Sequence, residues 1–264
     1  MPEGHTIRRL ATALERTFGG RVVTASSPQG RFADGAALLD GRPLTRADTW
    51  GKHLFARFDG TRLHVHLGLY GKVTFGTGEP PEARGALRLR LTVPDAWADL
   101  RGPTACEIVT PAEVTAIEAR LGPDPLRPRT DPMAAFARVA RSKVALGALL
   151  MDQSVVAGVG NVYRAEVLFR AGISPFRPGR EVRADEWLSL WQDLVALMRA
   201  GVRSGRIVTT LPEDRTRRSG RPTRDDASYV YRRAGLPCRR CGAEVQTRLM
   251  VGRNLYWCPQ DQPR

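Results

Sequence analysis

The sequence LLMDQSVVAGVGNVY at residues 149–163 is the most informative stretch of this chain. Its apolar start predicts the end of a helix, Gly158-Val159-Gly160 predicts a tight turn, and Asn161 predicts the N-cap of a second helix. Glycines in such a turn let backbone N–H groups approach an anion, and the following helix N-terminus adds positive potential. Because no lysine-bearing phosphate loop is present, the expected anion is a DNA phosphate. An ordinary helical hairpin remains the alternative.

Helical periodicity extends on both sides of this stretch. Apolar residues recur at helical spacing in four segments that we expect to be helices: 134–140, 143–152, 161–171 and 185–202. Before them, residues 121–132 contain four prolines and predict a linker. After them, residues 203–227 are rich in arginine, glycine and serine with almost no apolar pattern, which predicts a long, mobile, cationic loop.

The first half of the chain has a different pattern. Short alternating runs predict strands, among them 54–58, 63–67, 73–75 and 87–91. Several strands this close together favour a β-sandwich or barrel-like layer. A helix is expected at residues 6–18, with Thr6 as its cap and an apolar face formed by Ile7, Leu10, Leu14 and Phe18.

The charge of the chain predicts a polyanionic partner. The 264 residues carry a formal net charge of +14, with a pI near 10.8, and such an excess attracts polyanions through the summed field of the surface. No apolar run is long enough to cross a membrane and the N-terminus lacks the pattern of a signal peptide. We therefore expect a cytoplasmic protein.

Three of the four cysteines form a terminal cluster. The spacing Cys238-x₂-Cys241-x₁₆-Cys258 continues with x₂-Asp261, where a fourth cysteine would complete a strong zinc signal. A carboxylate also binds zinc, so we expect one structural Zn²⁺ per chain, held less tightly than by four thiolates. The alternative is a metal-free module that packs around the apolar residues of its hairpin. A catalytic metal is disfavoured because four protein ligands leave no open position.

The N-terminus offers a nucleophile. Removal of the initiator methionine would leave Pro2 with a secondary amine, whose pKa lies far below that of lysine. An unprotonated amine can attack an electrophilic carbon to form an iminium, and the adjacent Glu3 can move protons. By themselves, these two residues are better explained as a common second residue and a helix-dipole partner.

Taken together and in this order, these motifs resemble the formamidopyrimidine-DNA glycosylase/endonuclease VIII family along nearly the whole chain. Residues 2–4 resemble its catalytic start, 142–171 its helix–two-turns–helix element, and the tail its zinc finger. The motifs PEGHT at residues 2–6 and YVYRRAGLPC at 229–238 are most similar to the actinobacterial endonuclease VIII branch.

The resemblance implies roles for individual residues. Pro2 would attack C1′ of the damaged nucleotide, Glu3 would transfer protons at the sugar, and Lys52 would contact phosphate and assist elimination. The DNA-binding positions that it implies are His66, Leu69, Tyr70, Arg101, Asn161 and Arg253. Of these, Leu69 and Tyr70 match the wedge that fills the gap left by an extruded base. Arg101 would face the orphaned base, although the aromatic residue that usually follows in the family is absent here.

These observations predict an α+β fold. We expect an N-terminal β-sandwich flanked by helices (1–120), a linker (121–132), a helix–two-turns–helix domain with a basic loop (133–227) and a zinc-finger β-hairpin module (228–264). The resemblance implies a monomeric bifunctional DNA glycosylase and lyase of base excision repair, with damaged double-stranded DNA across a basic cleft between the domains. Oxidised pyrimidines are the expected substrates. The alternatives are the same chemistry on 8-oxoguanine and formamidopyrimidine, or a non-catalytic DNA-binding protein.

Overall fold

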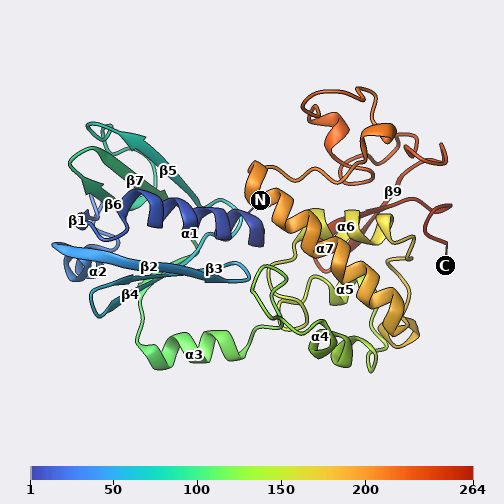
Figure 1. Ribbon diagram of the computed structural model, residues 1–264, viewed down its shortest axis with the longest axis horizontal. Coiled ribbons are helices and arrows are strands. Elements are labelled where there is room, and N and C mark those ends of the chain that lie inside the picture. The colour runs from blue at the N-terminus through green and yellow to red at the C-terminus, as the bar shows by residue number, and fades with distance from the viewer. Residues whose placement is uncertain (1, 264) are drawn as a thin grey trace. The chain divides into compact units, whose positions relative to one another are not determined.

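The computed structural model describes residues 2–263 (Figure 1). The chain forms two compact units, of which the first ends at Ala119 and the second begins at Arg120. None of the helices in the described residues is long and apolar enough to span a membrane. We describe each unit by itself.

The first unit is built on one antiparallel sheet with the strand order β5-β7-β6-β1-β2-β3-β4-β8. Strand β1 pairs with β2 through its first two residues and with β6 through its last three, so it joins the two halves of the sheet. Both halves contribute to one apolar core, which produces the two layers of the expected sandwich. The strands are Val22–Ser26 (β1), Arg42–Trp50 (β2), His53–Phe58 (β3), Thr61–His66 (β4), Lys72–Thr77 (β5), Leu87–Val93 (β6), Ala96–Arg101 (β7) and Ala105–Ile108 (β8).

Alternating side chains explain this sheet. In β6, Leu87, Leu89, Leu91 and Val93 are buried and the residues between them are partly exposed. A strand places successive side chains on opposite faces, so the alternation seen in the sequence becomes one face in the core and one toward solvent.

Three helices belong to this unit: α1 (Gly4–Phe18), α2 (Ala33–Leu39) and α3 (Pro111–Ala119). The apolar face expected for the first helix is buried. The expected cap at Thr6 was wrong, because the helix begins two residues earlier and Glu3 is its N-cap. The Thr6 backbone N–H donates to the Glu3 carbonyl oxygen at 2.8 Å. The sequence did not predict α2 or α3, which bury only one or two residues each.

Helix α1 runs antiparallel to β2, which places the start of the chain beside a particular turn. The Glu15 carboxylate accepts a hydrogen bond from the Ala47 backbone N–H at 2.9 Å, and the Arg8 guanidinium pairs with Asp48 at 3.1 Å. Earlier residues of the helix therefore meet later residues of the strand. The first residues of the chain lie toward the end of β2 that turns into β3 (Figure 1).

The second unit is helical and ends in a hairpin. Its core packs α7 against α4 and α6 around residues such as Trp187 and Leu190, which are fully buried. The elements are α4 (Pro132–Val139), α5 (Leu146–Leu149), α6 (Asn161–Arg170), α7 (Ala184–Ser204), the short 3₁₀ turns Gly179–Glu181, Pro212–Asp214 and Asp225–Ala227, and the hairpin strands β9 (Gln246–Met250) and β10 (Arg253–Trp257).

Two expectations for helices in this unit need correction. The helix expected at 143–152 is reduced to the single turn of α5, because the Leu146 and Gly147 N–H groups donate to the carbonyl oxygens of Arg177 and Pro175 at 2.8 and 2.9 Å. The N-cap of α6 is Gly160 rather than Asn161, which is the first helical residue. Tertiary partners thus override the local pattern at both positions.

The arginine-rich segment after α7 has defined contacts that the sequence did not predict. We call residues 205–227 the arginine-rich loop. The Thr209 N–H donates to the Ala227 carbonyl oxygen at 2.9 Å, and the Thr210 hydroxyl donates to the Asp226 carbonyl oxygen at 2.6 Å. Two 3₁₀ turns form within the loop. These hydrogen bonds close the loop at its base, and its mobility stays a prediction.

Candidate active site and metal centre

The expected nucleophile and its neighbour lie at the start of α1. Pro2 is partly exposed, whereas the Glu3 side chain is fully buried. Burial and the nearby charge of Arg9 lower the pKa of His5 to about 4. His5 is therefore neutral near pH 7. Removal of the initiator methionine would leave a partly exposed amine beside a buried carboxyl group, an arrangement suited to imine chemistry.

Lys52 lies in the tight turn between β2 and β3, toward which the first residues of the chain also lie. The preceding Gly51 has a φ of 60°, a conformation that favours glycine. This turn presents the lysine at one end of the strands, and the residue is partly exposed. The fold thus brings Pro2, Glu3 and Lys52 to one end of the first unit.

Three histidines and a glutamate form a polar cluster next to Lys52. The His64 Nδ1 lies 2.8 Å from the Glu107 carboxylate, and the His53 Nδ1 lies 2.9 Å from the His64 Nε2. Because a carboxylate only accepts, His64 donates from Nδ1 to Glu107. His66 packs on His53 with ring centroids 4.8 Å apart.

Of the residues in this cluster, the sequence analysis identified only His66 as a candidate site residue. Burial, then the charges of His64 and Lys52, lower the pKa of its imidazole, so His66 is neutral near pH 7. The alternation of His64 and His66 along one strand was the available signal. The partnership of His64 with Glu107 depends on pairing between β4 and β8, 43 residues apart.

Leu69 and Tyr70 lie on an exposed turn after β4. Tyr70 is 87% exposed and Leu69 is 40% exposed, which is unusual for large apolar side chains. The turn is closed by a hydrogen bond from the Gly71 N–H to the Leu67 carbonyl oxygen at 2.9 Å. A Cβ at Gly71 would lie 2.3 Å from that oxygen, so only glycine fits there. The turn is therefore a defined platform for two projecting side chains.

The structure gives Arg101 another contact. Its Nη2 donates to the fully buried Asp99 carboxylate at 2.7 Å, and its Nε donates to the Arg84 carbonyl oxygen at 3.2 Å. Asp99 also binds Arg90 through two hydrogen bonds. Because these contacts engage its guanidinium inside the sheet, Arg101 is a weaker candidate for contacting DNA than Tyr70.

The Asn161 side chain joins α6 to the hairpin. Its amide nitrogen donates to the Asn254 carbonyl oxygen at 2.9 Å, and its amide oxygen accepts from Arg164. Arg164 is fully buried and also donates to the Met250 carbonyl oxygen at 3.3 Å. Sequence reasoning missed Arg164, since only its burial distinguishes it from other arginines. These contacts fix the start of α6 relative to the hairpin that carries Arg253.

The turn before α6 is less open to anions than the sequence suggested. The Gly158 N–H donates to the Gln153 side-chain oxygen at 3.0 Å, so this amide is already used. Gly158 has a φ of 91°, which explains the glycine without a ligand.

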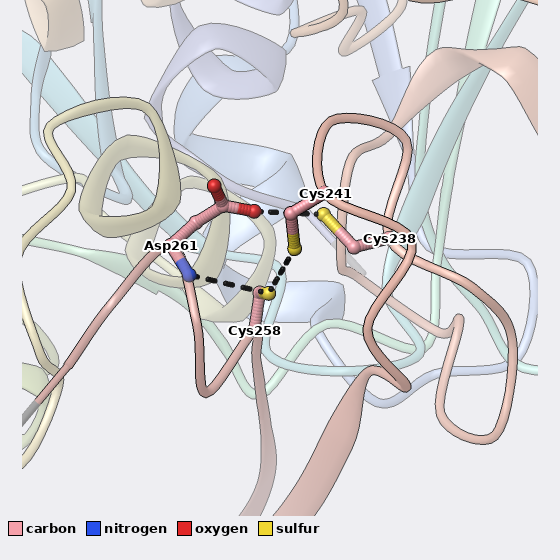
Figure 2. A group of neighbouring side chains, drawn as sticks. All are labelled: Cys238, Cys241, Cys258 and Asp261. Carbon is pink, nitrogen blue, oxygen red and sulfur yellow. Dashed lines mark hydrogen bonds between the residues drawn. The ribbon is translucent and has the colours of Figure 1, made fainter.

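The sequence-predicted metal ligands come together in the tail. The ligand atoms of Cys238, Cys241, Cys258 and Asp261 all lie within 4.8 Å of one another (Figure 2). Burial raises the pKa of the Cys258 thiol to about 12, so a bound cation is what would hold it as a thiolate. Three thiols and one carboxylate at this spacing fit a tetrahedral zinc ion.

Contacts around the cluster connect it to the rest of the unit. The Gln262 side chain accepts from the Cys258 N–H at 3.0 Å and donates to the Ile173 carbonyl oxygen at 2.9 Å. Between the ligands, β9 and β10 form the hairpin, whose turn has Val251 at a φ of 52°. Arg253 begins β10 and is partly exposed.

Comparison with known protein families supports the assignment of each part. Residues 1–106 match the formamidopyrimidine-DNA glycosylase N-terminal domain, residues 121–213 match the formamidopyrimidine-DNA glycosylase H2TH domain, and residues 235–264 match a zinc finger found in FPG and IleRS.

Individual relatives extend over the full length. The chain is 52% identical to Endonuclease 8 1 of Mycobacterium tuberculosis over 265 residues, covering 98% of each chain. It is 30% identical to Endonuclease 8 of Escherichia coli (98% of each chain). Identity to the formamidopyrimidine-DNA glycosylase of Thermus thermophilus is 34%, covering 99% of this chain and 97% of the relative.

A solved structure shares the fold. The complex between the Lactococcus lactis Fpg and an abasic site containing DNA matches with a TM-score of 0.82 at 22% identity, covering 99% of this chain and 100% of that chain. The domain matches and the full-length relatives lead to one conclusion: the chain belongs to the formamidopyrimidine-DNA glycosylase/endonuclease VIII family of DNA-repair glycosylases.

Proposed function

We propose that this protein excises oxidised bases, preferably pyrimidines, from double-stranded DNA and cleaves the strand at the resulting site by β,δ-elimination. The observation that carries the proposal is the grouping of a partly exposed Pro2, a fully buried Glu3 and the turn residue Lys52 at one end of the first unit. The full-length similarity of the chain to Endonuclease 8 1 and to formamidopyrimidine-DNA glycosylases supports the excision of damaged bases.

The proposed reaction begins at the Pro2 nitrogen. Its lone pair forms a bond to C1′ while the bond from C1′ to the base breaks, and the base leaves with the electron pair and takes up the proton that the Pro2 nitrogen loses. Proton transfer from Glu3 to the sugar ring oxygen opens the ring and gives the iminium. Loss of a proton from C2′ expels the 3′-phosphate, a second elimination expels the 5′-phosphate, and water releases Pro2.

The remaining residues would hold the DNA. Lys52, His66, Asn161 and Arg253 are proposed to contact phosphates, and Leu69 and Tyr70 to fill the gap left by the extruded base. Unstacking a base costs a few kcal/mol, which an inserted apolar side chain offsets. Arg101 would face the orphaned base only if Asp99 released it.

Trapping with borohydride tests this chemistry. Borohydride reduces an iminium to a stable amine, so we expect a covalent protein–DNA adduct with a duplex containing one abasic site and none with the undamaged duplex. Release of thymine glycol or 5-hydroxycytosine should exceed release of 8-oxoguanine or formamidopyrimidine under the same conditions. An absence of adduct would leave only DNA binding, and faster release of the purine lesions would reverse the substrate preference.

We also propose one structural zinc ion per chain, held by Cys238, Cys241, Cys258 and Asp261. Elemental analysis should give about one zinc per chain. A strong chelator should make three thiols reactive while Cys106 stays unreactive, because burial raises the pKa of its thiol to about 12. Asp261→Cys should bind zinc at least about tenfold more tightly than the natural chain, whereas the exposed-site control Glu244→Ala should not change affinity. A zinc-free preparation with an ordered hairpin would contradict the proposal.

A further inference from the structure

The two residues between Cys238 and Cys241 are both arginines, and both contact the arginine-rich loop. Arg239 and Arg240 are not among the metal ligands. The Arg239 side chain is nevertheless only 10% exposed, which is low for an arginine in a short surface turn. Its position indicates a role inside the second unit rather than at the surface.

Arg239 uses all three guanidinium nitrogens on one end of the loop. Its Nη1 lies 3.2 Å from the Asp226 carboxylate. Its Nη2 donates to the Asp225 carbonyl oxygen at 2.7 Å, and its Nε donates to the Ser228 carbonyl oxygen at 3.2 Å. A planar guanidinium with fixed donors suits such multiple contacts, which the single ammonium of lysine could not reproduce.

Asp226, which pairs with Arg239, also binds residues in the middle of the loop. Its carboxylate accepts hydrogen bonds from the Thr216 N–H at 3.0 Å, the Arg217 N–H at 3.3 Å and the Thr223 hydroxyl at 3.2 Å. The residue is 2% exposed. A buried carboxylate with four partners holds the loop in one conformation, because opening the loop would leave the buried charge without its partners.

Arg240 contacts Asp214 within the loop and Tyr229 just after it. Its guanidinium lies 4.9 Å from the ring centroid of Tyr229 and 3.8 Å from the Asp214 carboxylate. The Tyr229 hydroxyl donates to the same carboxylate at 2.5 Å and accepts from the Leu211 N–H at 3.0 Å. The two arginines therefore hold residues 211–214 and 225–228 from one short turn.

The loop also forms part of a pocket. Ile207, Arg224, Ser228 and Tyr231 line a space of about 550 Å³, together with Arg239 itself. This volume is within the range of pockets that take small organic groups. Because Arg239 both lines the pocket and fixes its wall, the shape of the pocket depends on this arginine.

We infer that Arg239 and Arg240 form a clasp that couples metal binding in the tail to closure of the arginine-rich loop. The turn from Cys238 to Cys241 keeps its shape when both cysteines bind the metal, and this shape aims the two arginines at the loop.

Limited trypsin digestion of the full chain tests the clasp without any activity assay. Trypsin cleaves after arginine unless proline follows, and the loop offers sites at Arg206, Arg215, Arg217, Arg218 and Arg224. Cleavage within the loop should be about tenfold faster in Arg239→Ala than in the natural chain, since proteolysis follows local opening. Arg199→Ala, which removes an exposed arginine of α7, should cleave like the natural chain. Chelator treatment of the natural chain should also accelerate cleavage within the loop.

Asp226→Asn provides a second variant, away from the metal ligands. It should accelerate loop cleavage while the zinc content stays the same, which separates the clasp from simple loss of metal. Equal loop cleavage in Arg239→Ala, Asp226→Asn and the natural chain would overturn the proposal. Faster cleavage only in preparations that have lost zinc would also overturn it.

Discussion

Blocking the Pro2 nitrogen is expected to lower base release by at least about 10³-fold and to abolish the borohydride-trapped adduct. The variant carries a Gly-Ser extension before Pro2, which converts the amine into an amide. An amide nitrogen has no lone pair available for attack on C1′, whereas a terminal amine with a pKa near 8 is unprotonated in about a tenth of the molecules at pH 7. Gel-resolved trapping and single-turnover base release measure the two effects.

Matched variants separate this effect from damage to the fold. The same Gly-Ser pair appended after the last residue should leave the adduct unchanged. Lys52→Gln should retain the adduct with slower strand cleavage, since Lys52 is proposed to contact phosphate and assist elimination rather than to form the covalent bond. Undiminished trapping by the N-terminally extended variant, together with its loss in Lys52→Gln, would assign the nucleophile to Lys52 instead.

Removing the Glu166 carboxylate is expected to cause the largest loss of stability. Glu166 is fully buried in α6 and accepts hydrogen bonds from the N–H groups of Tyr229, Val230 and Tyr231 at 2.7, 2.9 and 2.7 Å. It also accepts from the Thr209 hydroxyl. Glu166→Ala would leave these buried donors without their acceptor, at a cost of about 4 kcal/mol in the free energy of unfolding.

Urea unfolding followed by tryptophan fluorescence measures this loss, because Trp187, Trp191 and Trp257 all lie in the second unit. Glu166→Gln keeps the shape and one acceptor oxygen, so it should cost about half as much. Glu181→Gln changes an exposed glutamate of the same unit and serves as the control. If Glu166→Ala unfolded at the same urea concentration as this control, the buried carboxylate would not organise the segment 229–231.

Glu166 also shows why some side-chain contacts could not be predicted from the sequence. The sequence places residue 166 within an amphipathic helix, where a glutamate is usually exposed. Its partners lie 43 to 65 residues away, and only packing brings them together. The same is true of His64 with Glu107 and of Arg164 with Met250, whose separations are 43 and 86 residues.

Local expectations failed where a distant group competed for the same backbone atoms. Residues 143–152 have a helical pattern, yet the Arg177 and Pro175 carbonyl oxygens take the Leu146 and Gly147 N–H groups. Gly158 was expected to offer its N–H to an anion, yet Gln153 already accepts it. Propensity is a weak preference that such tertiary contacts override.

The sequence alone determined the family motifs, the helices at 161–171 and 185–202, the alternating strands and the four metal-ligand positions. Each of these rests on spacings within one element or on short ligand motifs. Such patterns can be read from the sequence without knowing which distant residues pack against them. Tertiary structure decided that Asp99 engages Arg101, that Asn161 joins α6 to the hairpin and that Arg239 holds the arginine-rich loop. The physical reason is that a charged or polar side chain takes its role from the partner it meets when buried, and that partner is chosen by packing between segments distant along the chain.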